Sequence, residues 1–394
     1  MKKKIIIVLL SIFVLHLCFR IYEYRNSYVT PYDAGFWKNR YDKSQWSTKP
    51  ACRDQNPHIN PYTCVWDDVW YAHHQNDRNA KYLKKGVIGD DLVYTYVGWE
   101  YIHGHDPTTL NAELPPFGKY LIGFSEVFFH NQNIFALLAG LFALGAFYLL
   151  NMQLFKNRFL AFIPVLLLSL EPLFYTMLNT ALLDTLYLGL ACMTFYFFLC
   201  KKYIPSFIFL GLMAATKATI ATFPLMAGVM FLYLILSKQK KEYKKYLLRL
   251  PLAFVVFTLT YTQYFLLGHN LREFLGVQKW IVNFYSEGVK GSPIIPWEIL
   301  FTGHWHTWWD SYETVKEWHI GWVLLFFIAF SAVITIIKKR YTKPITLVAL
   351  WTVVYFAFLC LIPTWPRYLL LILPFLYTLA VWIVTEKKLI KFKK

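Results

Sequence analysis

The sequence predicts an all-α integral membrane protein built from about ten transmembrane helices. Of its 394 residues, 57% are hydrophobic and 20% are aromatic, which leaves too little polar surface to cover a soluble globule of this size. Apolar runs of about 20 residues, the length that crosses a bilayer, recur along the whole chain between short charged turns. We find no internal repeat and no second soluble domain, so we expect residues 1–394 to form a single polytopic membrane domain.

The first apolar run follows three lysines and lacks a small-residue cleavage site, which indicates an uncleaved membrane anchor. The other runs follow at intervals along the chain and are typical of membrane-spanning helices. In chain order, the predicted spans are 5–22, 132–154, 159–177, 183–200, 204–217, 221–237, 247–267, 320–337, 344–362 and 367–385.

Positive charge is concentrated in every second turn between the spans. These clusters are Lys156/Arg158, Lys201/Lys202, Lys238–Lys245, Lys338–Lys343 and Lys387–Lys394. By the positive-inside rule, these turns and both termini are cytoplasmic. The net charge of +17 is therefore mainly a topology signal, and nucleic-acid binding is not expected, because that requires basic residues on one continuous face. Short cytoplasmic turns and a plain lysine tail favour a prokaryotic cell (inner) membrane.

Two long segments, 23–130 and 268–318, are extracytoplasmic loops in this topology. Nearly all acidic residues fall in the outer segments, so the active site is expected on that side. The first loop also contains Cys52 and Cys64, which an oxidising compartment would allow to pair. The sequence leaves both a disulfide and two free thiols open.

Three carboxylates in the first loop are the strongest candidates for catalysis. Asp90 and Asp91 begin a predicted interfacial helix, 92–103, which is rich in tyrosine and tryptophan. Glu113 precedes a double proline, after which a second interfacial helix, 119–129, is expected. Carboxylates placed in this way act as general bases or bind divalent cations. The alternative is that Asp90 only caps the helix and that Asp91 only adds a favourable first-turn charge.

The second loop contains a dense group of histidines and tryptophans at 304–310. A pair such as His304 and His306 without a third ligand is weak evidence for a metal, and alternation in a strand-like or interfacial segment is the commoner explanation. Aromatic rings also bind sugars by stacking, although tryptophans at a membrane boundary need no such role. We retain both histidines as candidate substrate contacts.

Six short segments occur in a characteristic order. They are Asp90-Asp91, Glu113 with Pro115–Lys119 (PPFGK), Asn179–Asp184 (NTALLD), Gly211–Thr219 (GLMAATKAT), Ser292–Trp297 (SPIIPW) and Pro366–Pro374 (PRYLLLILP). Together they resemble the C-type glycosyltransferases, specifically the protein O-mannosyltransferase and aminoarabinose-transferase family. The resemblance covers most of the chain from Gly89 onward. It departs at Leu114 and Asn179, where many members carry a basic residue.

This resemblance implies a C-type bundle whose two outer loops carry interfacial helices. It also implies an inverting glycosyltransferase that moves mannose, or another hexose or pentose, from a polyprenyl-phosphate carrier to a hydroxyl of a protein, lipid or envelope glycan. The implied catalytic residues are Asp90, Asp91 and Glu113, with Asp90 as the general base. A divalent metal cation held by these three carboxylates is left open, and no other cofactor is required.

The remaining implied site residues contact the substrate. Lys217 and Arg367, at outer helix ends, would hold the donor phosphate, and Asp184 would support the site from beneath. Lys119 ends the double-proline motif, and Trp297 ends the motif in the second loop. For the two helix-end cations, the alternative is simple anchoring at the membrane boundary.

The main alternative function is a membrane transporter or flippase for a lipid-linked or small solute. Transporters commonly carry ionisable residues near the bilayer midplane, on broken helices within inverted repeats. In this sequence the acidic residues gather outside the membrane, and we find no repeat. The sequence therefore favours the enzyme.

Overall fold

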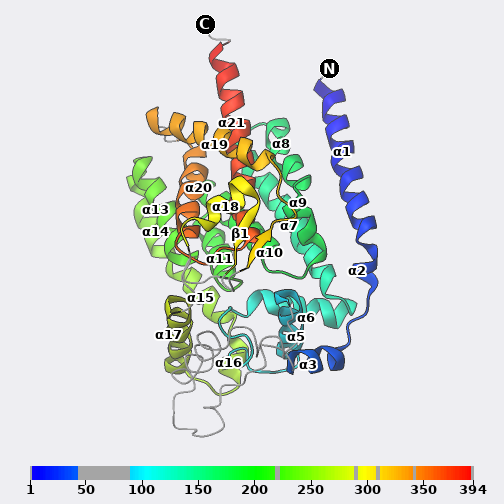
Figure 1. Ribbon diagram of the computed structural model, residues 1–394. Coiled ribbons are helices and arrows are strands. Elements are labelled where there is room, and N and C mark those ends of the chain that lie inside the picture. Colours follow the sequence, from blue (N-terminus) through cyan, green and yellow to red (C-terminus); the bar gives the residue numbers. More distant parts are fainter. Residues whose placement is uncertain are drawn as a thin grey trace.

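The computed structural model describes residues 2–42, 89–217, 222–287, 292–307, 311–339 and 343–391, so Cys52 and Cys64 lie outside it. This part of the chain is helical apart from one two-stranded sheet. The start of α1 (Lys2–Glu23) and the end of α21 (Leu373–Lys391) lie at one end of the bundle (Figure 1). The helices α5 (Asp90–Ile102), α6 (Phe117–Phe129) and α17 (Leu271–Glu287) lie at the other.

Several helices are long and apolar enough to cross a membrane. Within the described residues these are α1, α7 (Gln132–Phe155), α19 (Gly321–Lys338) and the stretch Pro366–Glu386, which combines η3 (Pro366–Leu371) with most of α21. A fifth candidate is the pair α8 (Arg158–Ser169) and α9 (Pro172–Thr176), which continues into η1 (Met177–Asn179) and is bent by 65°. The chain is therefore an integral membrane protein.

Shorter apolar helices occupy further predicted spans. They are α10 (Asp184–Leu199), α11 (Tyr203–Ala214), α13 (Ala227–Leu236), which follows the π-helix η2 (Thr222–Met226), and α20 (Ile345–Leu359). Each is shorter than the roughly 20 residues that cross a bilayer without help from flanking residues. The count of ten spans stays a prediction.

Three predicted spans are interrupted, and local chemistry explains each break. Pro172 begins α9 and lacks the N–H that would continue α8. The predicted span 247–267 divides into α15 (Pro251–Leu259) and α16 (Thr262–Leu266), where the hydroxyls of Thr260 and Thr262 donate to nearby backbone carbonyls. The last predicted span begins as a 3₁₀ helix, because Pro374 cannot donate to the carbonyl four residues earlier.

The central helix of the bundle is α10, most of whose residues are buried. It packs along α7 and α11. Gly189 permits the close approach to α7, because a Cβ atom there would lie 2.6 Å from the Phe142 ring. This packing fixes Asp184, the first residue of α10, near Arg367, which also contacts Asp90 at the start of α5.

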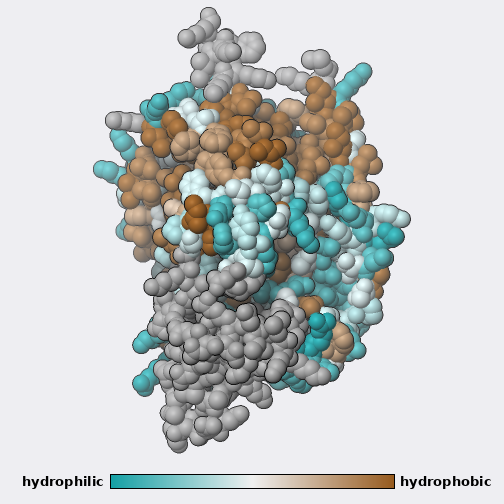
Figure 2. All heavy atoms as spheres, in the orientation of Figure 1, coloured by the Kyte–Doolittle hydropathy of each residue, from teal (hydrophilic) through white to brown (hydrophobic). Residues whose placement is uncertain are grey.

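The outer surface of the bundle is apolar, as a lipid-facing surface must be. No residue in the apolar window of α1 is buried, and Leu15 is 70% exposed. Hydrophobic residues cover most of the part that contains α19 and α21, whereas hydrophilic residues gather in the middle of this face and on its lower right flank (Figure 2). Such exposure is unfavourable in water and favourable in a bilayer.

The predicted helix at 92–103 forms as α5, but it does not lie on a lipid surface as expected. Residues Val93–Gly98 are buried between α6 and α3 (Ala34–Asp42). Glycines make this packing close, because a Cβ atom on Gly123 of α6 would lie 2.1 Å from the Gly98 carbonyl oxygen. In contrast, α6 exposes Phe124 and Phe128, which fits its predicted interfacial position.

The remaining elements lie in the loops. They are α2 (Arg25–Val29), α14 (Lys240–Arg249), α18 (Ile295–Thr302), β1 (His304–His306) and β2 (Tyr312–Thr314). The two strands form an antiparallel hairpin in which Trp305 pairs with Glu313. Because side chains alternate along a strand, Trp305 is buried while His304 and His306 lie on the more exposed face.

Candidate active site

Charged side chains from four separate segments meet near the start of α10. Arg367 in η3 donates a hydrogen bond to Asp90, the first residue of α5. Its Nε atom lies 3.7 Å from Oδ2 of Asp184. Oδ1 of Asp184 accepts a 2.6 Å hydrogen bond from Nζ of Lys217, which follows α11. These four predicted site residues thus form one charge cluster of alternating cations and carboxylates.

The charge cluster is deeply placed and is formally neutral. The side chains of Asp184 and Lys217 are 7% and 10% exposed, and that of Arg367 is 15% exposed. Charges at this depth are retained only when they are paired, because an isolated buried ion loses its hydration. Asp90 is the most exposed member at 26%, so the cluster is most accessible at this carboxylate.

Among the described residues, two buried atoms of the charge cluster have no hydrogen-bond partner, namely Nε of Arg367 and Oδ2 of Asp184. Buried polar atoms in native proteins are nearly always satisfied by protein, water or ligand. A planar guanidinium can bind two oxygens of one phosphate or carboxylate. Because these two atoms lie 3.7 Å from each other and Arg367 also holds Asp90, an anionic oxygen would compete with the two carboxylates for the guanidinium.

Aromatic rings pack against the cations of the charge cluster. Nζ of Lys217 lies 4.5 Å from the centroid of the Tyr368 ring, and the Arg367 guanidinium lies 5.2 Å from the Trp365 ring. Trp365 also packs against Trp305 of β1, at 5.0 Å between ring centroids. The hairpin of the second loop therefore contacts the wall of the site. Sequence reasoning missed Trp365 and Tyr368, and their only signal was their closeness to Arg367 in the chain.

A buried lysine, Lys119, donates hydrogen bonds to the turn that carries Glu113. Lys119 is fully buried, and its Nζ atom donates to the carbonyl oxygens of Asn111 at 2.6 Å and Leu114 at 2.8 Å and to the Tyr101 hydroxyl at 3.2 Å. Protein oxygens thus surround its ammonium group, and substrate contact by Lys119 stays a prediction. Burial lowers the pKa of Lys119 to about 7.

Asn111 holds the carboxylate of Glu113. Its backbone is left-handed, with φ of 49°, and its side-chain amide donates to Oε1 of Glu113. The other oxygen, Oε2, is buried and accepts no hydrogen bond from the part of the chain that the structure describes. Asparagine tolerates a left-handed backbone better than most residues. This preference is the one feature of the sequence that could have identified Asn111 as part of the site.

The three predicted carboxylates lie in different environments. Burial raises the pKa of Asp91, and it raises the pKa of Glu113 despite the opposing charge of Lys119. The charge of Asp90 also raises the pKa of Glu113, which places these two carboxylates within electrostatic reach of each other. Asp90 itself is held by Arg367. Asp90 and Glu113 thus belong to one polar region at the end of the bundle.

Tyr285 of α17 borders the same region. Although 47% of this residue is exposed, its hydroxyl lies within electrostatic reach of Glu113 and Asp90. Sequence reasoning missed this residue. It brings the second outer loop toward the carboxylates of the first.

The other predicted site residues have different surroundings. Trp297 packs against Phe356, with ring centroids 4.7 Å apart, in an apolar contact between α18 and α20. Nδ1 of His306 lies 3.2 Å from Oε2 of Glu298, and Nδ1 of His304 lies 3.1 Å from the Thr314 hydroxyl. Both histidines remain on the hairpin that contacts Trp365.

A metal site would need acidic or histidine side chains gathered around one point. Across the residues that the structure describes, no group of three or more His, Cys, Asp or Glu side chains is arranged to hold a metal ion. Asp90 faces Arg367, and Glu113 faces Asn111. A cation shared by Asp90, Asp91 and Glu113 would therefore require these side chains to rearrange.

Comparison with known proteins gives a fold but no sequence family. No protein-family model and no curated protein sequence matches the chain. The structure resembles that of ArnT from Cupriavidus metallidurans bound to undecaprenyl phosphate, with a TM-score of 0.56 and 19% identity over 76% of this chain. The apo state of the same protein gives a TM-score of 0.55 and 18% identity, also over 76% of this chain.

The match covers 56% of the ArnT chain in the bound structure and 55% in the apo structure, so this chain corresponds to little more than half of ArnT. At this level of identity, the comparison concerns the fold alone. The predicted resemblance is confirmed for the fold alone: the chain folds like ArnT.

Proposed function

We propose that the protein is an inverting glycosyltransferase that takes a sugar from a polyprenyl-phosphate carrier on the extracytoplasmic face of the membrane. The observation that carries this proposal is the charge cluster of Asp90, Arg367, Asp184 and Lys217 beside apolar helices. The ArnT-like fold supports it, since ArnT has been crystallised with undecaprenyl phosphate. The acceptor is a hydroxyl of a protein, a lipid or an envelope glycan.

The donor phosphate takes its counter-charges from Arg367 and Lys217. The carrier's apolar chain stays in the lipid beside the bundle, and its phosphate enters the polar end next to η3. Arg367 then pairs with phosphate oxygens through its planar guanidinium. Lys217 adds a second positive charge, and Asp184 keeps both cations in position. Negative charge that develops on the departing phosphate is stabilised by these fixed cations.

The acceptor is activated by Asp90. Arrival of the donor phosphate draws Arg367 away from Asp90, whose freed carboxylate accepts the proton of the acceptor hydroxyl. The acceptor oxygen bonds to the anomeric carbon, the bond from that carbon to the phosphate oxygen breaks, and the phosphate leaves with the electron pair. Attack from the face opposite the phosphate inverts the configuration. Asp91 and Glu113 orient the reacting groups.

The hairpin of the second loop is the proposed acceptor contact. His304 and His306 lie on its more exposed face, and Trp305 on its buried face joins it to Trp365. Acceptor binding at the hairpin would thereby affect the position of Trp365, which lies against Arg367.

The test is transfer of radiolabel by the purified full-length protein. The protein is incubated with radiolabelled polyprenyl-phosphate hexose or pentose and mixed acceptors, and wild type is compared with Asp90→Asn and Glu113→Gln. The matched control is Asp42→Asn, which removes an exposed carboxylate on α3. Covalent transfer by wild type and the control, but not by the two site variants, supports the proposal.

Equal transfer by all four proteins would remove Asp90 and Glu113 from the chemistry. Uptake of labelled solute into proteoliposomes without covalent transfer would instead identify a transporter. These two outcomes are separated by chromatography of the label, because only transfer changes its chemical form.

A further inference from the structure

A second site lies at the other end of the helices that carry the charge cluster. A pocket of about 320 Å³ is lined by Leu199, the last residue of α10, and by Tyr203, the first residue of α11. The opposite ends of these helices lead to Asp184 and Lys217. Because α10 has 16 residues at a rise of 1.5 Å each, the pocket lies about 24 Å from the charge cluster.

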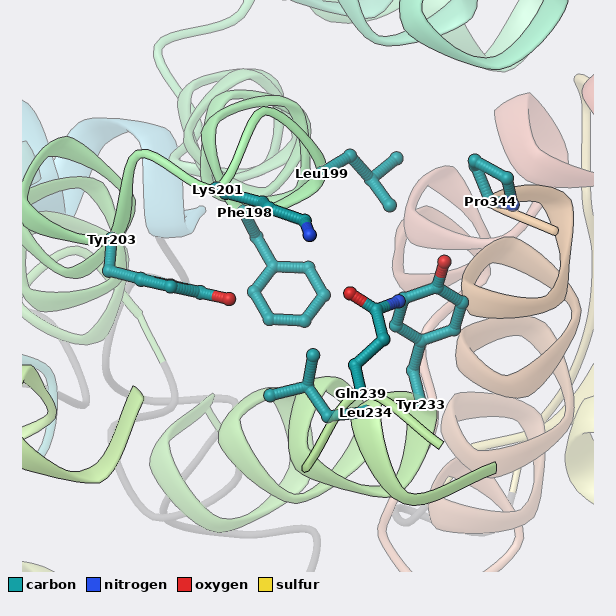
Figure 3. A pocket seen from close by; sticks show the side chains of 8 residues that line it. All are labelled: Phe198, Leu199, Lys201, Tyr203, Tyr233, Leu234, Gln239 and Pro344. Carbon is teal, nitrogen blue, oxygen red and sulfur yellow. The ribbon is translucent and has the colours of Figure 1, made fainter. Parts of the chain in front are cut away.

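The pocket combines polar groups with an apolar floor. Its polar lining residues are Lys201, Tyr203, Tyr233 and Gln239, and its apolar lining residues include Phe198 and Leu234. The Lys201 ammonium, the Gln239 amide and the Tyr203 hydroxyl are directed into it, around the Phe198 ring (Figure 3). Its volume is at the lower end of the range for small-molecule sites. This lining fits a small amphiphilic ligand whose head is polar.

Two lysines beside the pocket occupy backbone positions that favour glycine. Lys201 follows α10 with φ of 59°, and Lys238 follows α13 with φ of 55°. Helices commonly end in this left-handed conformation, where glycine or asparagine is preferred. A lysine here complements the negative end of the helix dipole, and it also adds positive charge beside the pocket.

Positive charge exceeds negative charge around the pocket. Glu242 is buried, and its Oε2 atom accepts a 2.9 Å hydrogen bond from the Tyr203 hydroxyl. Its Oε1 atom lies 3.7 Å from Nζ of Lys201 and 3.5 Å from Nζ of Lys245. Both lysine side chains are more than half exposed, and one carboxylate faces two ammonium groups. A net positive charge therefore remains available to an anion.

Helix α14, beside the pocket, exposes several lysines. Tyr243 and Tyr246 of α14 turn toward the bundle, while Lys240, Lys241 and Lys244 are exposed. Clusters of lysines at the end of a membrane-spanning bundle are attracted to anionic lipid head groups. The pocket opens at the same level, because its walls are the ends of the apolar helices α10 and α13.

We propose that this pocket binds the phosphate head group of an anionic phospholipid. Lys201 and Lys245 contact the phosphate, Gln239 donates to it, and the start of the acyl region lies on Phe198. In the predicted topology this lipid belongs to the cytoplasmic leaflet, opposite the sugar donor. The site does not depend on the proposed sugar transfer.

The key variant is Lys201→Gly, which removes the charge and suits the left-handed backbone, so that strain cannot explain a loss of binding. Its matched control is Lys156→Gly, because Lys156 ends α7 with φ of 54° on the same side of the predicted membrane. Full-length proteins in detergent are titrated with phosphatidylglycerol or phosphatidylcholine, and retained lipid is counted by native mass spectrometry.

Wild type and Lys156→Gly are expected to retain phosphatidylglycerol in preference to phosphatidylcholine, and Lys201→Gly to bind phosphatidylglycerol about fivefold more weakly. Lys201→Arg is expected to retain binding. Equal loss in the two glycine variants, or no loss in either, would overturn the proposal.

The source of the phosphate is tested separately with glycerol 3-phosphate and inorganic phosphate. If the lipid is the ligand, neither compound displaces phosphatidylglycerol at millimolar concentration. Displacement by either compound that is lost in Lys201→Gly would overturn the lipid assignment and identify a soluble phosphate ester or ion as the ligand.

Discussion

Arg367 donates a hydrogen bond to Asp90 across 277 residues of sequence. Arg367 stands at the start of the last apolar stretch, and Asp90 begins α5 within the first outer loop. The contact ties α5 to the bundle and occupies the guanidinium while no donor is present. In the proposed reaction, the donor phosphate and Asp90 compete for Arg367, so that donor binding and activation of the base are coupled.

This competition predicts opposite effects of Asp90→Asn on binding and on catalysis. The variant frees Arg367 for phosphate, so polyprenyl phosphate is expected to bind about fivefold more tightly, which corresponds to the loss of a partly exposed ion pair. Sugar transfer is expected to fall by about 100-fold or more, because the general base is removed. Equilibrium binding and initial rates measure the two effects. Weaker binding of the carrier would contradict the competition between Asp90 and phosphate.

The pair Asp184 and Lys217 predicts a non-additive effect on stability. Asp184→Asn leaves a buried ammonium group without its carboxylate and is expected to lower the free energy of unfolding by about 3 kcal/mol. Adding Lys217→Met removes the unpaired charge and is expected to restore most of that loss. Urea unfolding in detergent measures the cycle. The control is Glu23→Gln, which breaks an exposed pair with Arg20 and should cost about 0.5 kcal/mol or less.

The sequence predicted the members of the charge cluster because each belongs to a short motif and the motifs keep their order. It could not predict their pairing, which depends on how η3 approaches the starts of α5 and α10. The sequence also could not predict the burial of Lys119, because a lysine near a membrane boundary usually extends to water. Its burial results from the close crossing of α5 and α6 at Gly98 and Gly123.

That crossing predicts the effect of Gly123→Ala. The added methyl group would lie 2.1 Å from a backbone oxygen of α5, so the two helices must separate. We expect a loss of about 2 kcal/mol in the free energy of unfolding, as for other overpacked sites, and reduced transfer, because Asp90 moves with α5. Gly145→Ala is the matched control, since nothing lies within 4 Å of a Cβ atom there. Unchanged stability in Gly123→Ala would mean that the helices are not in close contact.

The predicted topology can be tested by labelling single introduced cysteines in a variant that lacks the native cysteines. A cysteine at Glu313 on β2 is expected to react in intact cells with a reagent that cannot cross membranes. A cysteine at Lys241 on α14 is expected to react only after the membrane is opened. Labelling of both positions from outside, or the reverse order, would contradict the assignment of the active site to the extracytoplasmic face.

Lys119 predicts how stability depends on pH. Burial lowers its pKa to about 7 in the folded protein, whereas an unfolded lysine titrates near 10.4. Between these values the unfolded chain binds a proton that the folded protein has released, so the free energy of unfolding rises with pH across this window. The slope from this group is about 1.4 kcal/mol per pH unit at most. Lys119→Met removes the group, so the difference between wild type and variant isolates its contribution. Unfolding measured from pH 7 to pH 9 should show wild type gaining stability relative to Lys119→Met, and a constant difference would contradict a buried, readily deprotonated Lys119.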